Sequence, residues 1–263
     1  MNTIDSMQVK KVISVCMFVV IGFTVFAQKQ RVNNLTTFDD KLIHFGFTLG
    51  LNTLDFGVAH YNELKDNPDY IETVPGDFFP NEEVIEGSSN VRADVARLIP
   101  GFTVGIISSV RMNRDMELRF QPGLSFGERQ LTYNVDVVQT GVSAATQFYS
   151  IKSTFLDFPL LIKYKARRIN NDRPYVIFGP AFRYNINRSS SEDLVIIENG
   201  SFYAEVGAGW DHYFTFFRFS VEAKVSFGLN NQIGPPPETQ RPYYSQAISR
   251  LRSNIFTLSF HFE

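Results

Sequence analysis

The sequence predicts an all-β fold: an eight-stranded antiparallel up-and-down transmembrane β-barrel with long external loops and short periplasmic turns. Three observations predict it: eight segments in which large apolar residues alternate with small or polar ones, connections that alternate between short and long, and an apolar run near the N-terminus. The composition agrees, because 26 Phe and 11 Tyr accompany a single Trp, and aromatic residues favour extended, pleated surfaces. The formal charge of −2 gives no indication of a nucleic-acid partner.

A basic and then apolar stretch opens the chain. Lys10 and Lys11 precede VISVCMFVVIGFTVF, and small residues follow, a pattern typical of a secretory signal peptide. We expect a signal peptide at 1–27, cleaved before Gln28, and then a short periplasmic segment at 28–42. A lipoprotein carrying lipid on Cys16 and a retained anchor helix are the alternatives. Because Cys16 is the only cysteine, an intramolecular disulfide framework is excluded.

The barrel is expected to occupy residues 43–263. Each segment keeps a period of two for about ten residues, the length of a tilted strand that crosses a membrane. The bulky row is predicted to face lipid and the other row to line the lumen. Pro122, Pro159 and Pro180 fall inside segments, where each removes a backbone donor, and bulges or rim positions are expected at the first two. The segments are 43–52, 98–110, 116–128, 156–165, 175–185, 201–211, 217–230 and 254–263.

The connections set the orientation. Short connections at 112–115, 166–174 and 212–216 alternate with long ones, so all long loops lie at one end of the barrel. In membrane barrels the long loops are external and the short turns periplasmic. A soluble barrel or sandwich, with its apolar row turned inward, is the alternative. The long connections are 53–97, about 129–155, 186–200 and 231–253.

Two sets of strand residues are candidates for structural roles. The terminal segment, NIFTLSFHFE, is predicted to close the barrel against 43–52. The inward rows carry charges of both signs, which are expected to pair in a lumen too narrow to conduct. The predicted lipid-facing row of the closing strand is Phe256, Leu258, Phe260 and Phe262, and the predicted lumen charge network is Glu117, Arg119, Asp157, Lys163, Arg183, Glu205, Arg218, Glu222 and Lys224.

The first long loop is acidic, with ten carboxylates against three basic residues between positions 55 and 97. A solvated surface is one interpretation of this charge. A docking surface, with aromatic anchors and acidic groups that steer a partner, is the other. The candidate partner-binding residues are Tyr61, Tyr70, Asp77, Phe78, Phe79, Glu82 and Glu83.

The sequence contains no recognisable catalytic, cofactor or metal pattern. Asp211 and His212 are neighbours on a predicted strand, so they point to opposite faces. His60 with Ser88 or Ser89 would be a hydrolase pair, but no nucleophile motif surrounds either serine. We expect no enzyme, no cofactor, no bound metal and no small-molecule substrate.

The stretch KLIHFGFTLGLNTLDF at 41–56 resembles the opening strand of the PorT family, outer-membrane barrels of Bacteroidetes. The resemblance continues in PGFTVGIISSVRMN (100–113), LRFQPGLSFGERQLTY (118–133), FLDFPLLIKYK (155–165) and RPYVIFGPAFRYN (173–185). It implies a non-catalytic component or assembly factor of the type IX secretion system. That system exports proteins with a C-terminal sorting domain and, in gliding species, the motility adhesins. The implied partners are outer-membrane lipid and other envelope proteins of that system. The alternative is an OmpA- or OmpX-like structural or adhesive barrel unrelated to secretion.

Overall fold

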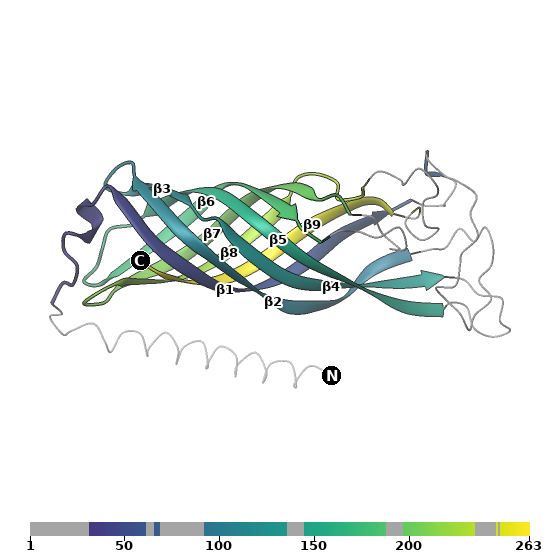
Figure 1. Ribbon diagram of the computed structural model, residues 1–263, viewed down its shortest axis with the longest axis horizontal. Helices are drawn as coiled ribbons and strands as arrows, with labels where there is room; N and C mark the ends of the chain where they lie inside the picture. The colour runs from purple at the N-terminus through teal and green to yellow at the C-terminus, as the bar shows by residue number, and fades with distance from the viewer. Residues whose placement is uncertain are drawn as a thin grey trace, which may run out of the picture. The chain divides into compact units, whose positions relative to one another are not determined.

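The computed structural model describes residues 32–61, 66–68, 92–135, 145–187, 197–234, 246 and 248–263. Asn34–Glu263 is one compact unit, built from antiparallel strands and one short 3₁₀ helix, η1 (Figure 1). No helix within the described ranges is long and apolar enough to cross a membrane. The elements are η1 (Phe38–Asp40), β1 (Ile43–His60), β2 (Arg92–Arg111), β3 (Met116–Phe120), β4 (Gly123–Val135), β5 (Ala145–Lys165), β6 (Asp172–Asn185), β7 (Gly200–Tyr213), β8 (Arg218–Gly228) and β9 (Ile248–Phe262).

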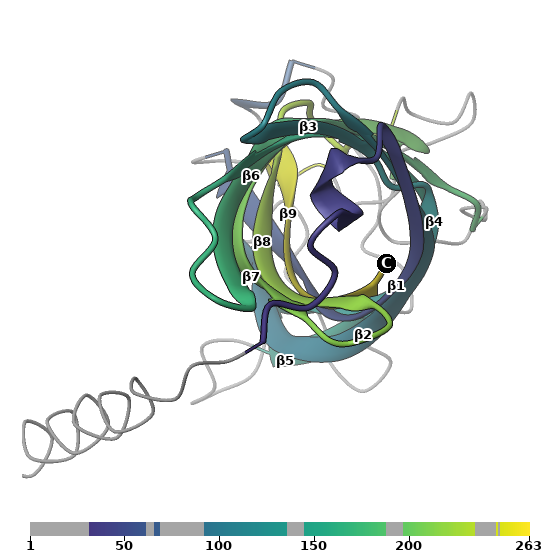
Figure 2. The ribbon, with the colours of Figure 1, turned by 90° about the vertical axis from the view of Figure 1, so that its left-hand side faces the viewer.

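The strands close into a ring, because β1 pairs with β2 on one side and with β9 on the other (Figure 2). Around the rest of the ring, each strand pairs antiparallel with the next along the chain. β3 and β4 together occupy one strand position of the ring, between β2 and β5, because both pair with these two strands. The ring therefore has eight strand positions and confirms the predicted up-and-down antiparallel barrel.

Gln121 and Pro122 separate β3 from β4. Pro122 has no backbone N–H to donate, but its carbonyl accepts a hydrogen bond from the N–H of Ile106 at 2.9 Å. The N–H of Gln121 donates to the carbonyl of Pro159 at 3.2 Å. Backbone pairing to both neighbours therefore continues across the break. Pro159 and Pro180 lie inside β5 and β6.

The strands are longer at the external end than the alternation predicts. β1, β2 and β5 contain 18, 20 and 21 residues, against the roughly ten needed to cross a membrane. β1 and β9 stay paired through Asp55 and Asn254 as far as His60 and Ile248. Backbone pairing needs no apolar row once the outer face meets water, so the alternation ends before the strands do. The predicted bounds of the loop at 53–97 are therefore wrong.

The two faces of the wall have opposite chemistry. Outside, large apolar side chains are exposed and stack across strands; the Phe47 and Phe262 ring centroids are 4.8 Å apart, and those of Phe102 and Phe126 4.6 Å apart. Inside, most of the buried side chains are polar or charged. Exposed apolar area of this extent marks a surface covered by another medium, and an apolar outer band is the surface that membrane barrels present to lipid. The soluble alternative, with the apolar row inward, is wrong.

Apolar side chains of β1, β5, β6, β7 and β9 fill the lumen toward its long-loop end. Arg129 lies among them with its guanidinium carbon 4.0 Å from the centroid of the Phe56 ring. Nη2 of Arg129 donates to the hydroxyl of Ser253 at 2.5 Å. The section of the lumen nearer the short turns is charged. The buried apolar cluster consists of Leu54, Phe155, Ala181, Tyr203 and Ile255.

Candidate functional site

The charged section of the lumen is the candidate site. On β8, Arg218, Glu222 and Lys224 alternate with the outward residues and are buried. The period of two puts them on the inner face, where charged residues of β3, β5, β6 and β7 meet them. An unpaired charge in such an interior costs several kcal/mol, so the pairing decides whether this lumen is stable.

Arg183 organises the cluster next to the apolar layer. Its guanidinium lies 3.1 Å from the carboxylate of Asp157 and 2.6 Å from that of Glu205. Glu205 also pairs with Nζ of Lys224 at 2.8 Å. The guanidinium carbon of Arg183 lies 4.5 Å from the centroid of the Tyr203 ring. Arg183 therefore pairs with both Asp157 and Glu205, and Lys224 pairs with Glu205. The Tyr203 ring covers the guanidinium of Arg183.

A small cavity adjoins this cluster. Its volume is about 20 Å³, and Gln121, Asp157 and Arg183 are among its lining residues. A space of this size holds about one water molecule. The space beside the Arg183 cluster is therefore a pocket for solvent within a packed lumen and is far too small for a solute.

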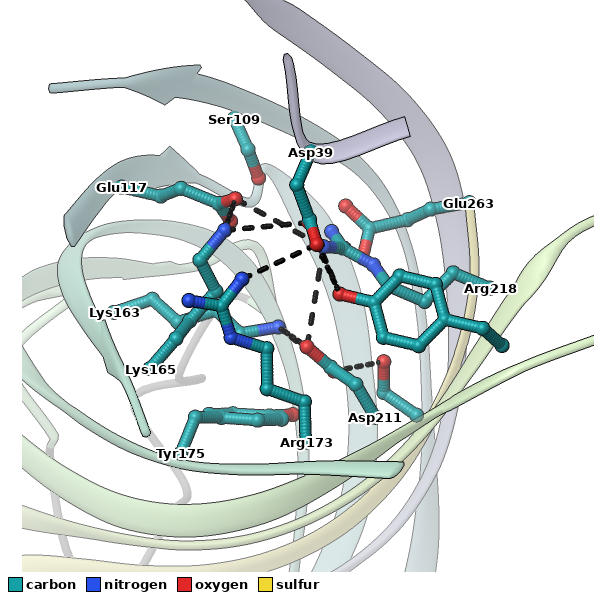
Figure 3. A network of polar contacts seen from close by, with 12 residues as sticks. Asp39, Ser109, Glu117, Lys163, Lys165, Arg173, Tyr175, Asp211, Arg218 and Glu263 are labelled. Atoms are coloured by element: carbon teal, nitrogen blue, oxygen red, sulfur yellow. Dashed lines mark hydrogen bonds and ion pairs between the residues drawn. The ribbon is translucent and has the colours of Figure 1, made fainter. Parts of the chain in front are cut away.

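A second cluster lies nearer the short turns (Figure 3). Nζ of Lys163 pairs with Asp211 at 2.7 Å. The guanidinium of Arg119 contacts Glu222 at 3.3 Å and Glu263 at 3.2 Å. These contacts join β3, β5, β7, β8 and the residue that follows β9, so the cluster ties opposite parts of the wall together.

Arg218 extends the second cluster toward the barrel mouth. Its guanidinium lies 2.7 Å from the carboxylate of Glu263, and that of Glu117 is 3.8 Å away. Glu117 also forms an ion pair with Lys165. The hydroxyl of Tyr175 donates to Glu222 at 2.9 Å. Every carboxylate of this cluster therefore has at least one cationic partner.

The segment that precedes β1 reaches this cluster from the short-turn end of the barrel, where η1 lies over the opening of the ring (Figure 2). It brings the carboxylate of Asp39 to the hydroxyl of Tyr213, at 2.8 Å and 3.0 Å from its two oxygens. Arg173 and Lys165 lie 3.2 Å and 3.5 Å from the same carboxylate. The guanidinium of Arg218 is 3.7 Å away, so four side chains of the barrel contact the Asp39 carboxylate.

The neighbours of Asp39 hold the segment in the same place. The ring of Phe38 stacks on that of His44, with centroids 4.5 Å apart. The guanidinium carbon of Arg218 lies 4.9 Å from the centroid of the Phe38 ring. The backbone N–H of Asn34 donates to Oδ1 of Asn171 at 2.9 Å. Aromatic, ionic and backbone contacts together close the mouth of the barrel with its own chain.

The surroundings of Asp39 fix its charge. Burial raises the pKa of the carboxyl, but the charge of Lys165 and the hydrogen bond from Tyr213 lower it. The charges of Arg218 and Arg173 lower it further, so the pKa lies below its ordinary value. Asp39 is therefore ionised at neutral pH.

Asp39 also brings the enclosed charge closer to balance. Among the described residues, eight basic side chains are buried in and around the lumen against six acidic ones, counting Glu263 but not Asp39. Asp39 supplies a seventh carboxylate, with a side chain that is 21% exposed. The basic residues are Arg119, Arg129, Lys163, Lys165, Arg173, Arg183, Arg218 and Lys224, and the six acidic ones are Glu117, Asp157, Glu205, Asp211, Glu222 and Glu263.

The sequence comparison with protein families identifies the class of this barrel. The model of the family described as outer membrane protein beta-barrel domain matches residues 26–234, more than half of the chain. The chain belongs to this family. It is therefore an outer-membrane β-barrel protein, and its exposed apolar band is the surface in contact with membrane lipid.

No curated protein matches the sequence. Among solved structures, the N-terminal β-barrel domain of Pseudomonas aeruginosa OprF is 13% identical, with a TM-score of 0.31, over 82% of this chain and 97% of that one. OprG from Pseudomonas aeruginosa is 11% identical, with a TM-score of 0.39, over 89% and 96% of the two chains. A Pseudomonas aeruginosa FadL homologue is 8% identical, with a TM-score of 0.25, over 87% and 92%. These likenesses concern the fold alone.

The outer-membrane barrel brings the nine residues predicted for its lumen into the two clusters described above, and all nine are buried. The sequence did not predict Asp39, Arg173 or Tyr213 as residues of the lumen, because they lie outside or at the ends of the alternating segments. It also left out Glu263. The alternation of β9 would have predicted Glu263, because residues 257, 259 and 261 face inward and position 263 continues the same row.

The other two predicted sets lie on the outside or at the external end. On β9, Phe256 is 47% exposed, and Leu258, Phe260 and Phe262 are half-buried by their neighbours on the outer face. Of the predicted docking residues, only Tyr61, which is half-buried, belongs to the described residues. The remaining loop candidates, which lie outside them, are Tyr70, Asp77, Phe78, Phe79, Glu82 and Glu83.

Proposed function

We propose that this outer-membrane barrel is a non-enzymatic component or assembly factor of a type IX secretion system in a member of the Bacteroidetes. It supports the export of cargo with C-terminal sorting domains and, in gliding species, of motility adhesins. The resemblance of KLIHFGFTLGLNTLDF (41–56) and FLDFPLLIKYK (155–165) to the PorT family carries this proposal. Its partners are other envelope proteins of the same system.

The filled lumen supports a role in binding. The apolar layer, the two charged clusters and the inserted Asp39 segment occupy the interior in turn. A barrel closed in this way gives cargo no path through its centre. Its contribution to export is therefore made by its surfaces, among which the external extensions of β1, β2 and β9 and the acidic loop at 61–91 are proposed to contact partners.

The histidines of the wall support a non-enzymatic role. Nδ1 of His212 bonds Asp172 at 2.7 Å, and Nδ1 of His261 bonds the hydroxyl of Thr48 at 2.9 Å. Both contacts join neighbouring strands of the wall. Among the described residues, no group of three or more His, Cys, Asp or Glu is placed to hold a metal ion. Ser88 and Ser89, which were weighed with His60 as a hydrolase pair, lie outside the described part of the chain.

Deletion of the gene tests the proposal. We expect proteins with sorting domains to stop reaching the cell surface and to accumulate in the periplasm, while other outer-membrane proteins stay at normal levels. A plasmid copy should restore export. Normal secretion of sorting-domain cargo in the deletion strain would refute the proposal.

The OmpA- or OmpX-like structural or adhesive barrel predicts the opposite pattern. Its loss weakens the envelope or cell adhesion and leaves cargo secretion unchanged. Sensitivity to detergent and vancomycin, measured beside secretion in the same strain, separates the two functions.

We further propose that residues 1–27 are a signal peptide and that the mature protein begins with Gln28. The apolar run after Lys10 and Lys11 supports this processing. N-terminal sequencing of protein purified from outer membranes tests it, and an N-terminus at Met1 or at Cys16 would refute it.

A further inference from the structure

The periplasmic end of the barrel contains a cleft of about 440 Å³ that adjoins the ion pairs around Asp39. Two turns border it: residues 112–115, between β2 and β3, and residues 166–171, between β5 and β6. Six basic side chains line it against three acidic ones, so the cleft has an excess of positive charge. The basic residues are Arg111, Arg114, Lys165, Arg167, Arg168 and Arg173, and the acidic ones are Asp39, Asp40 and Asp115.

The three carboxylates of the cleft already form ion pairs with its basic residues. Arg173 lies 3.2 Å from Asp39 and 3.1 Å from Asp115. Arg111 lies 3.7 Å from Asp40. Lys165 is shared between Asp39 and the buried Glu117. The three carboxylates therefore offset part of the positive charge of the cleft and leave it cationic as a whole.

Three arginines of the cleft, Arg114, Arg167 and Arg168, have no carboxylate partner among the described residues. The guanidinium of Arg168 is already engaged, because it donates to the backbone carbonyls of Asn34 and Asn170. Arg114 and Arg167 therefore supply the charge that is available to a ligand. Both side chains are exposed, and within the described ranges neither guanidinium has a hydrogen bond or an ion pair. The turn that carries Arg114 is fixed, because Nη2 of Arg173 donates to the carbonyl of Arg114 at 3.2 Å. Two guanidinium groups next to a cleft are the arrangement that binds a phosphate group best, since each presents a planar pair of donors.

The outer wall indicates where this phosphate comes from. Tyr164, which also lines the cleft, belongs to the lipid-facing row of β5 and is 51% exposed. Met112 and Ile169, one in each bordering turn, are 61% and 67% exposed. Tyrosine is enriched where a membrane protein crosses the headgroup layer. The cleft therefore opens at the level of the periplasmic headgroups, beside apolar residues that acyl chains can cover.

We propose that this cleft binds the phosphate of an anionic phospholipid from the periplasmic leaflet, with Arg114 and Arg167 as its ligands and Tyr164 against the start of the acyl chains. The lipid docks the two turns, and with them Arg173 and the inserted Asp39 segment, against the membrane surface. The site depends on the barrel and its orientation, and it holds whether or not the protein serves type IX secretion.

Native mass spectrometry of the full barrel, released from detergent micelles with added lipid, tests the site. We compare retention of phosphatidylglycerol with that of phosphatidylcholine in the wild type and in the double variant Arg114→Gln/Arg167→Gln. The matched control is Arg250→Gln/Arg252→Gln, which removes two exposed charges from the external end of β9. Heat-modifiable migration in gels checks that all three proteins are folded.

The wild type and the control are expected to retain phosphatidylglycerol in preference to phosphatidylcholine. The Arg114/Arg167 variant should lose roughly 10- to 30-fold of its phosphatidylglycerol affinity, the effect of two arginines at a membrane surface. Equal losses in both double variants would mean diffuse charge attraction and would overturn the site. Displacement of phosphatidylglycerol by equimolar inorganic phosphate would overturn the assignment to lipid.

Discussion

At the scale of single residues, Asp39 shows how one carboxylate fixes the position of a whole segment. The segment before β1 has no strand partner along most of its length. Its position depends on the contacts of Asp39 with Tyr213, Arg173 and Lys165 and on the stacking of Phe38 on His44. Removing the charge of Asp39 should therefore release the segment and leave the wall in place.

Asp39→Asn is expected to weaken docking of the segment by about 1–3 kcal/mol, the contribution of hydrogen bonds to a charged group. Hydrogen exchange of residues 34–42 should become faster while that of β5–β8 stays unchanged. The matched control is Asp40→Asn, because the side chain of Asp40 is 78% exposed and its only ion pair with another described residue is the 3.7 Å contact with Arg111. Equal protection of the segment in wild type and Asp39→Asn would show that the carboxylate does not hold it.

Acid should release the segment for the same reason. The pKa of Asp39 lies below the ordinary value of 3.8, so its contribution to docking is complete above that value and is lost as the pH falls through the lowered pKa. We expect exchange of residues 34–42 to accelerate below about pH 4 in the wild type. In Asp39→Asn this step should be absent; an identical acid response in the variant would assign the step to other groups.

At the scale of elements, the long strand β1 contains two zones. On β1, Leu49 lies in the lipid-facing row with a side chain that is 46% exposed. Ala59 is exposed on the same outer face, ten positions further on, in the part of β1 that extends beyond the apolar band. The two residues differ in the medium that they meet, although both belong to one strand and one face.

A charge substituted at these two positions should reveal where the membrane ends. Leu49→Arg is expected to destabilise the barrel in lipid by about 2–4 kcal/mol, the cost of arginine on the lipid face. Ala59→Arg should change stability by less than about 1 kcal/mol, as at a water-facing position. Urea unfolding in lipid vesicles measures both; similar costs at the two sites would contradict the proposed limit of the lipid band.

The ion pairs that join the strands make a different prediction. Lys163 on β5 and Asp211 on β7 are 2.7 Å apart, and both side chains are fully buried. Asp211→Leu removes the carboxylate that pairs with the buried Lys163 and should lower the free energy of unfolding by about 3–5 kcal/mol. Lys163→Met/Asp211→Leu should recover most of this loss, because an apolar pair can replace a buried ion pair of similar volume.

Urea unfolding of the two single variants and the double variant forms the cycle that tests this pair. If the double variant loses as much free energy of unfolding as the two single variants together, Lys163 and Asp211 do not stabilise each other. Strong positive coupling is expected instead, although Arg218 at 3.9 Å and Ser220 at 2.6 Å also contact Asp211 and will retain part of the single-variant cost.

The strand pattern could be predicted because lipid and lumen impose opposite chemistry on alternate residues. The same rule predicts that the side chains of Arg119, Lys163 and Glu222 face the lumen. It does not extend to partners across the lumen, since pairing between β5 and β7 depends on strand tilt and side-chain reach, which the period of two does not encode. Asp39 was beyond the rule altogether, because its segment has no alternation to indicate that it enters the barrel.

The external ends of the strands show a second limit. Beyond the lipid band the outer face of the wall meets water, so exposed residues such as Arg250 and Arg252 replace the outward apolar row that would mark a strand. Only backbone pairing, as between β1 and β9, continues there. The sequence therefore predicts the part of each strand that lipid selects and underestimates the rest.

At the scale of the whole molecule, the interior of the barrel is closed by its own side chains and by the segment before β1. An eight-stranded barrel leaves an interior that side chains can fill, and here the apolar layer and two charged clusters lie in it. Closure explains why binding surfaces, rather than transport through the lumen, are the proposed route to function.

Conductance of the purified, folded barrel in planar lipid bilayers tests closure most directly. We expect a flat current under applied voltage, with no stepwise openings. Heat-modifiable migration of the protein recovered from the bilayers verifies that it was inserted and folded. Regular, reproducible current steps from the wild-type protein would mean that the lumen is an open pore and would contradict the account.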